Sequence, residues 1–160
     1  MLGHSVPPAK PALPPRTLPA VLPATPLAAT FATDAGAFYV YFPCDGLMYT
    51  QGVGYISADC AHELVELAVQ RLSAQPRAAY YHDWAELKGY DTQARHIFTK
   101  WALEQHNLAR IAVLTRSQLL AMGVSAFELA LEALGRRPPV HACTSRAAFV
   151  ADLVAYLSAA

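Results

Sequence analysis

The chain has 160 residues, 54% of them hydrophobic, and it carries twelve basic and twelve acidic side chains. This length and composition suffice for one domain with a buried core, so disorder throughout is excluded. The zero net charge lacks the basic footprint of a nucleic-acid-binding protein, so no nucleic acid partner is expected. The three cysteines form no CxxC pair, which argues against a disulfide framework and a zinc ribbon. We therefore expect reduced thiols in a cytoplasmic protein.

The first 33 residues differ in composition from the rest. They hold eight of the twelve prolines, and proline lacks the backbone donor that helices and sheets need. This favours a disordered or polyproline II tail over residues 1–33, followed by one domain over residues 34–160. No stretch of 18 apolar residues free of proline and charge occurs, so no membrane span is expected.

Hydrophobic periodicity then predicts nine elements in chain order. Asp45-Gly46 is a turn signal between the first two strands. Ser57 or Asp59, then Asp91, then Ser117 are candidate helix N-caps, and Gly135 is a candidate stop. Strands are predicted over 35–42, 47–56, 77–84, 108–115 and 140–144, and helices over 57–75, 91–106, 117–135 and around 149–157.

This ββαβαβαβα order predicts an α/β fold. An opening hairpin followed by three βαβ crossovers implies a mixed sheet of about five strands, with parallel members in its centre. The strand over residues 108–115 is apolar on both faces, which is typical of a buried parallel strand.

The stretch 80–101 joins the end of a predicted strand, a polar loop and an amphipathic helix. Because Asp83 and Asp91 flank this loop at the carboxyl end of a strand, we expect a ligand or partner site there. Trp101 falls on the apolar face of the helix and is predicted to be core. His82 and Trp84 follow the exit of the strand and are predicted to lie at the rim.

The carboxyl ends of the other parallel strands bring further polar residues to the same edge, namely Thr115, Arg116, Ser117, Thr144 and Ser145. Helix starts beside hydroxyl groups favour an anion or a phosphorylated side chain. The alternative is plain helix capping, which such residues commonly provide. No catalytic or nucleotide-binding motif occurs, and the Cys60/His62 and His141/Cys143 pairs are too few for a metal site. No cofactor or metal is therefore expected.

The order of elements and the stretch 83–92 resemble the bacterial STAS domains, the family of sulfate transporters and anti-sigma-factor antagonists. In that family a strand ends in Asp, and after a loop a second Asp precedes Ser or Thr at a helix start. Asp83 and Asp91-Thr92 occupy these places, and by resemblance Thr92 would be the phosphorylation site. Gln93 and Ala94 depart from the family pattern, which continues with Ser or Thr and then Gly. The resemblance covers residues 35–160. The chain is also similar to a divergent STAS-like group without an established activity.

Three functions follow as hypotheses. The first is a non-enzymatic regulatory module that binds a protein partner through residues 83–95. The second is a small apolar ligand or lipid-binding protein, since aromatic residues rim the same sheet end and related STAS-like folds hold apolar ligands. The third is an enzyme that uses Asp83 and Arg116. A flat polar surface would favour the first, an apolar cavity beside Trp84 the second, and a charged cleft the third. The candidate site residues are Asp83, Trp84, Tyr90, Asp91, Thr92, Arg95, Arg116 and Ser117.

The strand FYVYF, residues 38–42, is apolar on both faces. An edge strand of this kind invites pairing with a second chain, which predicts a homodimer through this strand. The alternative is that a helix covers its second face.

Overall fold

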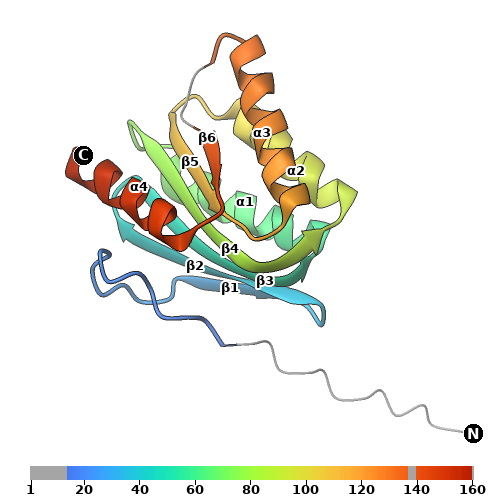
Figure 1. Ribbon diagram of the computed structural model, residues 1–160, viewed down its shortest axis with the longest axis horizontal. Helices are drawn as coiled ribbons and strands as arrows, with labels where there is room; N and C mark the ends of the chain where they lie inside the picture. The colour runs from blue at the N-terminus through green and yellow to red at the C-terminus, as the bar shows by residue number, and fades with distance from the viewer. Residues whose placement is uncertain (1–13, 137–139, 160) are drawn as a thin grey trace, which may run out of the picture.

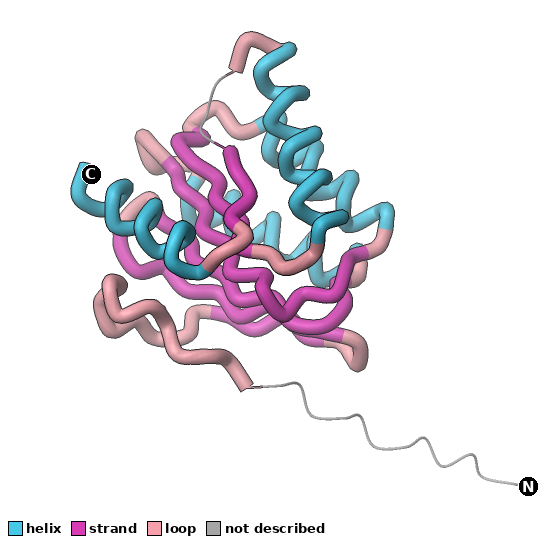
Figure 2. Tube along the Cα trace, viewed as in Figure 1, coloured by secondary structure: helices cyan, strands magenta, loops and turns pink. Residues whose placement is uncertain are grey.

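The chain forms a single mixed sheet with helices on both of its faces (Figures 1 and 2). The computed structural model describes residues 14–136 and 140–159. Its elements are β1 (Ala29–Ala32), β2 (Gly36–Cys44), β3 (Leu47–Ile56), α1 (Ala58–Leu72), β4 (Ala78–Tyr90), α2 (Thr92–Glu104), β5 (Leu108–Leu114), α3 (Gln118–Ala133), β6 (Val140–Cys143) and α4 (Arg146–Ala159).

The six strands lie in the sheet in the order of the sequence. β1, β2 and β3 pair antiparallel, whereas β3, β4, β5 and β6 pair parallel. The predicted α/β class and the opening hairpin at Asp45-Gly46 are confirmed, and the sheet has one strand more than expected. The additional strand is β1, which lies within the predicted tail and pairs with β2.

The first three helices begin at the predicted caps and end two or three residues before the predicted bounds, and α4 begins earlier than predicted, at Arg146. The side chains of Ser57, Asp91 and Ser117 accept backbone N–H groups at the starts of α1, α2 and α3. Gly135 has a φ of 71° and, together with Arg136, donates backbone hydrogen bonds into the last turn of α3, which is a Schellman stop. Gly123 does not divide α3, because the helix is continuous through it.

The main difference from the predicted fold is the length of β4. The expected polar loop between Asp83 and Asp91 is absent, because β4 continues to Tyr90 and pairs with β3 up to the last residue of both strands. Gly52 on β3 makes this possible: a Cβ there would lie 2.8 Å from Cδ1 of Trp84. Without a side chain at position 52, the Trp84 indole packs against β3, and the register shift beside it accommodates the ring.

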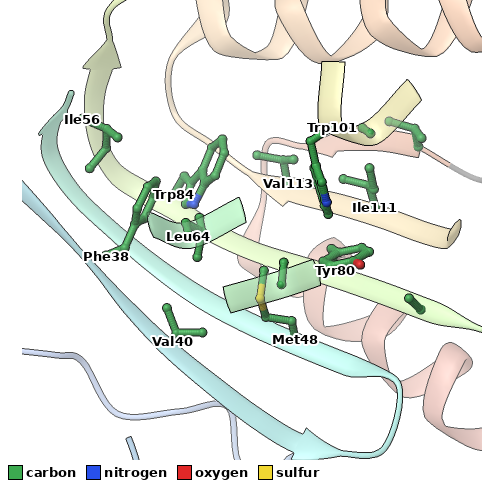
Figure 3. Close-up of a cluster of buried hydrophobic side chains, with 14 of the residues drawn as sticks. Phe38, Val40, Met48, Ile56, Leu64, Tyr80, Trp84, Trp101, Ile111 and Val113 are labelled. Atoms are coloured by element: carbon green, nitrogen blue, oxygen red, sulfur yellow. The ribbon is translucent and has the colours of Figure 1, made fainter. Parts of the chain in front are cut away.

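Two apolar layers hold the sheet, one on each face. The first lies under α1, α2 and α3 and contains Trp84 and Trp101, whose exposed fractions are 7% and 8% (Figure 3). The prediction that Trp101 is core is therefore confirmed. The prediction that Trp84 and His82 lie at the rim is wrong, because the extension of β4 carries both side chains into this first layer.

The second apolar layer lies under α4 and the segment 14–28, which precedes β1. Phe149 and Leu153 from α4 and Leu22 from the segment pack there against the tyrosines of the sheet. In Figure 1 this segment runs beside β1 and β2, on the same side of the molecule as α4. Both faces of the central strands are thus covered.

The prediction of a disordered tail is wrong for residues 14–33. The amide side chain of Gln51 accepts from the backbone N–H of Arg16 and donates to its carbonyl oxygen, both at 2.9 Å. Leu22 is buried, and β1 supplies ladder hydrogen bonds that proline does not interrupt. Residues 1–13 lie outside the described part of the chain.

The predicted homodimer through residues 38–42 loses its physical basis. β2 is an interior strand between β1 and β3, so it offers no free edge. Its side chains from Phe38 to Tyr41 are buried on both faces, by the helices on one and by α4 and the segment 14–28 on the other.

Deletion of residues 1–33 is expected to lower the melting temperature by at least about 6 °C. The deletion removes β1, the burial of Leu22 and the contacts of Arg16, together at least about 3 kcal/mol. Thermal unfolding followed by circular dichroism measures the shift, with deletion of residues 1–13 as the reference. A melting temperature unchanged from that reference would contradict the packing of residues 14–33.

Candidate functional site

A cavity of about 340 Å³ lies between the sheet and helices α1, α2 and α3. Side chains from all three helices and from β3 to β6 form its wall, which is mostly apolar. Its volume falls within the range of small-molecule sites. The residues that matter below are His82, Trp84, Tyr90, Arg95, Phe98 and Gly123.

Aromatic rings form one end of this cavity. The ring centroid of Trp84 lies 5.7 Å from that of Phe38, 5.8 Å from that of Phe98 and 6.5 Å from that of Tyr90. These separations are typical of favourable aromatic pairs, and each pair fixes the orientation of its neighbours. Because the rings come from β2, β4 and α2, this end of the cavity is preformed.

His82 supplies a polar group in the cavity wall. Its Nδ1 lies 2.7 Å from the hydroxyl of Thr50, which also accepts the indole N–H of Trp84 at 3.3 Å. Burial lowers the pKa of His82 to about 3, so the ring is neutral at physiological pH. If Thr50 donates its own hydrogen to Nδ1, it accepts from Trp84 and donates to His82 at once, and the ring proton of His82 sits on Nε2. The cavity wall therefore carries a neutral imidazole.

Trp101, in the wall of the cavity, packs against Tyr80 without a hydrogen bond between them. The indole N–H of Trp101 and the hydroxyl of Tyr80 are buried and have no hydrogen-bond partner in the described chain. The two rings are perpendicular, with centroids 4.7 Å apart, and the nitrogen of Trp101 lies on the side facing Tyr80 (Figure 3). This is the geometry of an N–H group directed at an aromatic ring, which compensates part of the donor's burial.

An outer groove continues from the cavity to the surface. It runs between the ends of β3 and β4 and the first turns of α2 and α3, and Tyr55, Lys88, Thr92 and Ser117 line it. Three residues line both the cavity and the groove, and we call them the junction: Tyr90, Arg95 and Gly123.

Glycine at position 123 keeps the junction open. A Cβ at this position would lie 3.4 Å from the hydroxyl of Tyr90, so a longer side chain would enter the space between the cavity and the groove.

Asp91 fixes the walls of the groove. One of its carboxylate oxygens accepts the backbone N–H of Ala94 at 2.6 Å, and the other accepts that of Ala58 at 3.0 Å. The side chain of Asp91 thus caps both α1 and α2, whereas the sequence predicted it only as the cap of α2. Both of its oxygens are engaged in these caps, so its role in the site is to position the helices.

Asp83 points to the opposite face of the sheet, as alternation along a strand requires. It is 1% exposed and accepts from Arg146 at 2.8 Å and from Arg16 at 2.9 Å. The hydroxyl of Tyr49 also donates to it, at 3.3 Å. Asp83 therefore joins β4, α4 and the segment 14–28, and it does not reach the cavity.

The predicted pairing of Asp83 with Arg116 is wrong. The side chain of Arg116 is 73% exposed and lies 3.5 Å from Glu86. The register of β4 turns Asp83 toward the segment 14–28, whose arginine takes the place assigned to Arg116. The charged cleft that an enzyme with this pair would need is therefore not formed.

The predicted site residues thus fall into separate places. Trp84, Tyr90 and Arg95 meet at the cavity, while Thr92 and Ser117 line the groove. Asp83 lies on the other face, and Arg116 is at the surface. The sequence reasoning missed His82 and Gly123. The pattern His82-x-Trp84 on one strand face was available as a signal once the strand was known to continue.

A second polar cluster lies under α4 and has a structural role. Arg110, His141 and the hydroxyl of Tyr81 all contact the carboxylate of Asp152. Burial alone would raise the pKa of Asp152, but hydrogen bonds from Arg110 and Tyr81 outweigh it and hold this pKa below its usual value. Burial raises the pKa of the nearby Cys143 thiol, so the cluster holds no reactive thiolate. Within residues 14–136 and 140–159, no three His, Cys, Asp or Glu side chains gather as a metal ion would require.

Asp83→Asn is expected to lower the free energy of unfolding by about 2 to 3 kcal/mol. The change leaves two arginines without their buried anion, although both are partly exposed to water. Glu86→Gln is the matched control: it also faces Arg16, at 3.7 Å, but is half exposed, so its cost should stay within about 0.5 kcal/mol. Urea unfolding measures both losses. Equal losses would show that Asp83 is no more important than a surface pair.

His82 should make the protein less stable as the pH falls from 6.5. The unfolded chain binds a proton at His82 below about pH 6.5, whereas the folded chain does so only near pH 3, so the burial of neutral His82 contributes fully above pH 6.5 and progressively less below it. Between pH 7.5 and 5, the parent should lose about 2 kcal/mol more than His82→Gln in urea unfolding. If the free energy of unfolding of the two proteins changed with pH in the same way, this would contradict a buried neutral imidazole.

Comparison with known proteins shows the fold alone. No family model and no curated protein match the chain. A solved structure of an uncharacterised DUF3478-family protein with a SpoIIAA-like fold, from Shewanella loihica PV-4, is similar: it is 13% identical, with a TM-score of 0.55, over 75% of this chain and 96% of that one. In the described part of the chain no helix is long and apolar enough to cross a membrane. The chain therefore has a SpoIIAA-like α/β fold, which confirms the STAS-like architecture that its sequence resembles.

Proposed function

We propose that this protein binds a small, mainly apolar molecule in the cavity between the sheet and helices α1, α2 and α3. The observation that carries this proposal is the cavity itself: about 340 Å³, walled mostly by apolar side chains and open to the surface through the groove. Ligand sites of proteins are typically concave and apolar, with a few placed polar groups. His82 is such a group here.

The size of the cavity limits the ligand. A cavity of about 150 Å³ lined by aliphatic and aromatic side chains is enough to hold benzene. The cavity here has more than twice that volume. It would therefore accept a two-ring aromatic compound or a chain of about ten methylene-sized groups, at about 30 Å³ for each.

The hypothesis of a protein-binding surface around Asp83 to Arg95 has less support. Asp83 and Trp84 are buried, and Asp91 is occupied by two helix caps. Of the predicted site residues in this range, only Thr92 and Arg95 are exposed, and two side chains make a small recognition surface. Phosphorylation of Thr92 stays a prediction from the resemblance, at an exposed position in the first turn of α2.

A protein partner at α3 is the second candidate function. Leu119 is 79% exposed, and Met122, Leu129 and Leu134 are also exposed large apolar side chains of this helix and its C-cap. Such a row is unusual on a surface helix and favours a contact with another molecule. This row of apolar side chains borders the outer groove, because two of its members, Leu119 and Met122, also line the groove.

Gly123→Leu is expected to weaken binding of a neutral apolar probe at least tenfold. The leucine side chain would fill the junction beside Tyr90 while leaving the strands unchanged. Titration with N-phenyl-1-naphthylamine, followed by its fluorescence, measures the affinity, and circular dichroism checks the fold. Ser125→Leu is the control: it adds the same side chain two residues away on α3, at an exposed position that lines neither the cavity nor the groove, and it should bind as the parent does. Equal binding by parent and Gly123→Leu would place the probe elsewhere, and no binding by the parent would contradict the proposed function.

A further inference from the structure

The junction between the cavity and the groove carries positive charge that nothing in the described chain neutralises. Among residues 14–136 and 140–159, no acidic side chain lies within ion-pair distance of Arg95 or Lys88. The hydroxyl of Tyr90 likewise has no hydrogen-bond partner in that part of the chain. Two groups that donate hydrogen bonds, Tyr90 and Arg95, thus stand together at the mouth of an apolar cavity.

From this arrangement we propose that the ligand is an anionic amphiphile. Its carboxylate or phosphate head would bind Arg95 and the hydroxyl of Tyr90 at the junction, and its apolar body would fill the cavity. This inference rests on the proposed function and names the chemical class of the ligand.

The nearby acids form no ion pair with Arg95 in the described part of the chain. Asp91 lines the groove, but its two oxygens already accept backbone N–H groups of α1 and α2. Glu86 is on the same strand, and it pairs with Arg16 and Arg116. The guanidinium of Arg95 is therefore available to a ligand.

The polarity of the two spaces matches the two ends of such a ligand. Among the described residues that line the cavity there is no lysine and one arginine, Arg95, which lies at the junction, while His82 inside the cavity is neutral. The groove adds Lys88 and the first turns of α2 and α3, whose N–H groups favour negative charge. A head group inside the cavity would lose its hydration without a cation to replace it, whereas at the junction it gains one.

Arginine suits this head group better than a lysine would. The planar guanidinium donates two parallel hydrogen bonds to a carboxylate or a phosphate, which also fixes the direction of the bound chain. The charge of Arg95 is close enough to Tyr90 to act against the effect of burial, which is the larger one and raises the pKa of Tyr90. Tyr90 therefore stays protonated and donates to an anion.

The test compares three ligands of equal chain length: decanoate, decyl phosphate and 1-decanol. Isothermal titration at pH 7.5 measures their affinities for the parent, for Arg95→Gln, and for Lys100→Gln. Lys100 lies on α2 like Arg95, but its side chain is 79% exposed and it lines neither the cavity nor the groove, so this variant controls for the loss of one positive charge.

We expect the parent to bind at least one of the two anions more tightly than the alcohol. Arg95→Gln should weaken that anion about tenfold or more and change the affinity for 1-decanol less than twofold, while Lys100→Gln should behave as the parent. The two anions distinguish a carboxylate head from a phosphate head.

The inference and the proposed function fail in different ways. If the alcohol binds as tightly as both anions, or if Arg95→Gln weakens alcohol and anions equally, the anionic head is wrong and the cavity remains a ligand site. If none of the three compounds binds to the parent, the proposed function falls together with the inference.

Discussion

The parallel pairing of β3 with β4 is the constraint on which the rest of the structure depends. It extends β4 well past the point where its apolar character ends, so successive residues of one strand serve opposite faces of the sheet. His82 and Trp84 are directed under the helices and shape the cavity, whereas Asp83 is directed to the other face and binds Arg16 and Arg146. The cavity wall and the attachment of the N-terminal segment are therefore built from neighbouring residues of a single strand.

Electrostatics divides the molecule between these two faces. On the α4 face, Asp83 and Asp152 are each surrounded by cations and hydroxyl donors, and the pairs hold a helix and a segment of irregular backbone to the sheet. On the other face the interior is apolar, and the single imidazole there is neutral because a charged ring would lose its hydration. The unpaired Arg95 stands at the border of this apolar region, where water and low polarity meet. At this border a charged side chain keeps part of its hydration, and its interaction with an opposite charge is stronger than in bulk water.

Sequence patterns predicted the order of the elements well, because caps such as Ser57, Asp91 and Ser117 and the apolar faces of the helices are local signals. They failed where tertiary contacts override composition. The polar run after Trp84 reads as a loop, but a long neighbouring strand pairs with it. The proline-rich segment reads as a free tail, but a buried glutamine binds its backbone at Arg16. The face of the sheet on which each predicted site residue lies depends on the register of β4, which local patterns do not determine.

The two helix caps made by Asp91 also determine which wall of the cavity is able to move. One carboxylate holds the amino-terminal ends of α1 and α2 together, next to the last residue of β4, so these two helices are restrained to move as a pair. The start of α3 is held by its own local cap, Ser117, and shares no such restraint with them. The start of α3, on the side of the junction where Gly123 lies, therefore lacks the shared cap, while its other end is held to α2 by Arg136, which donates to the carbonyl oxygens of Leu103 and Gln105.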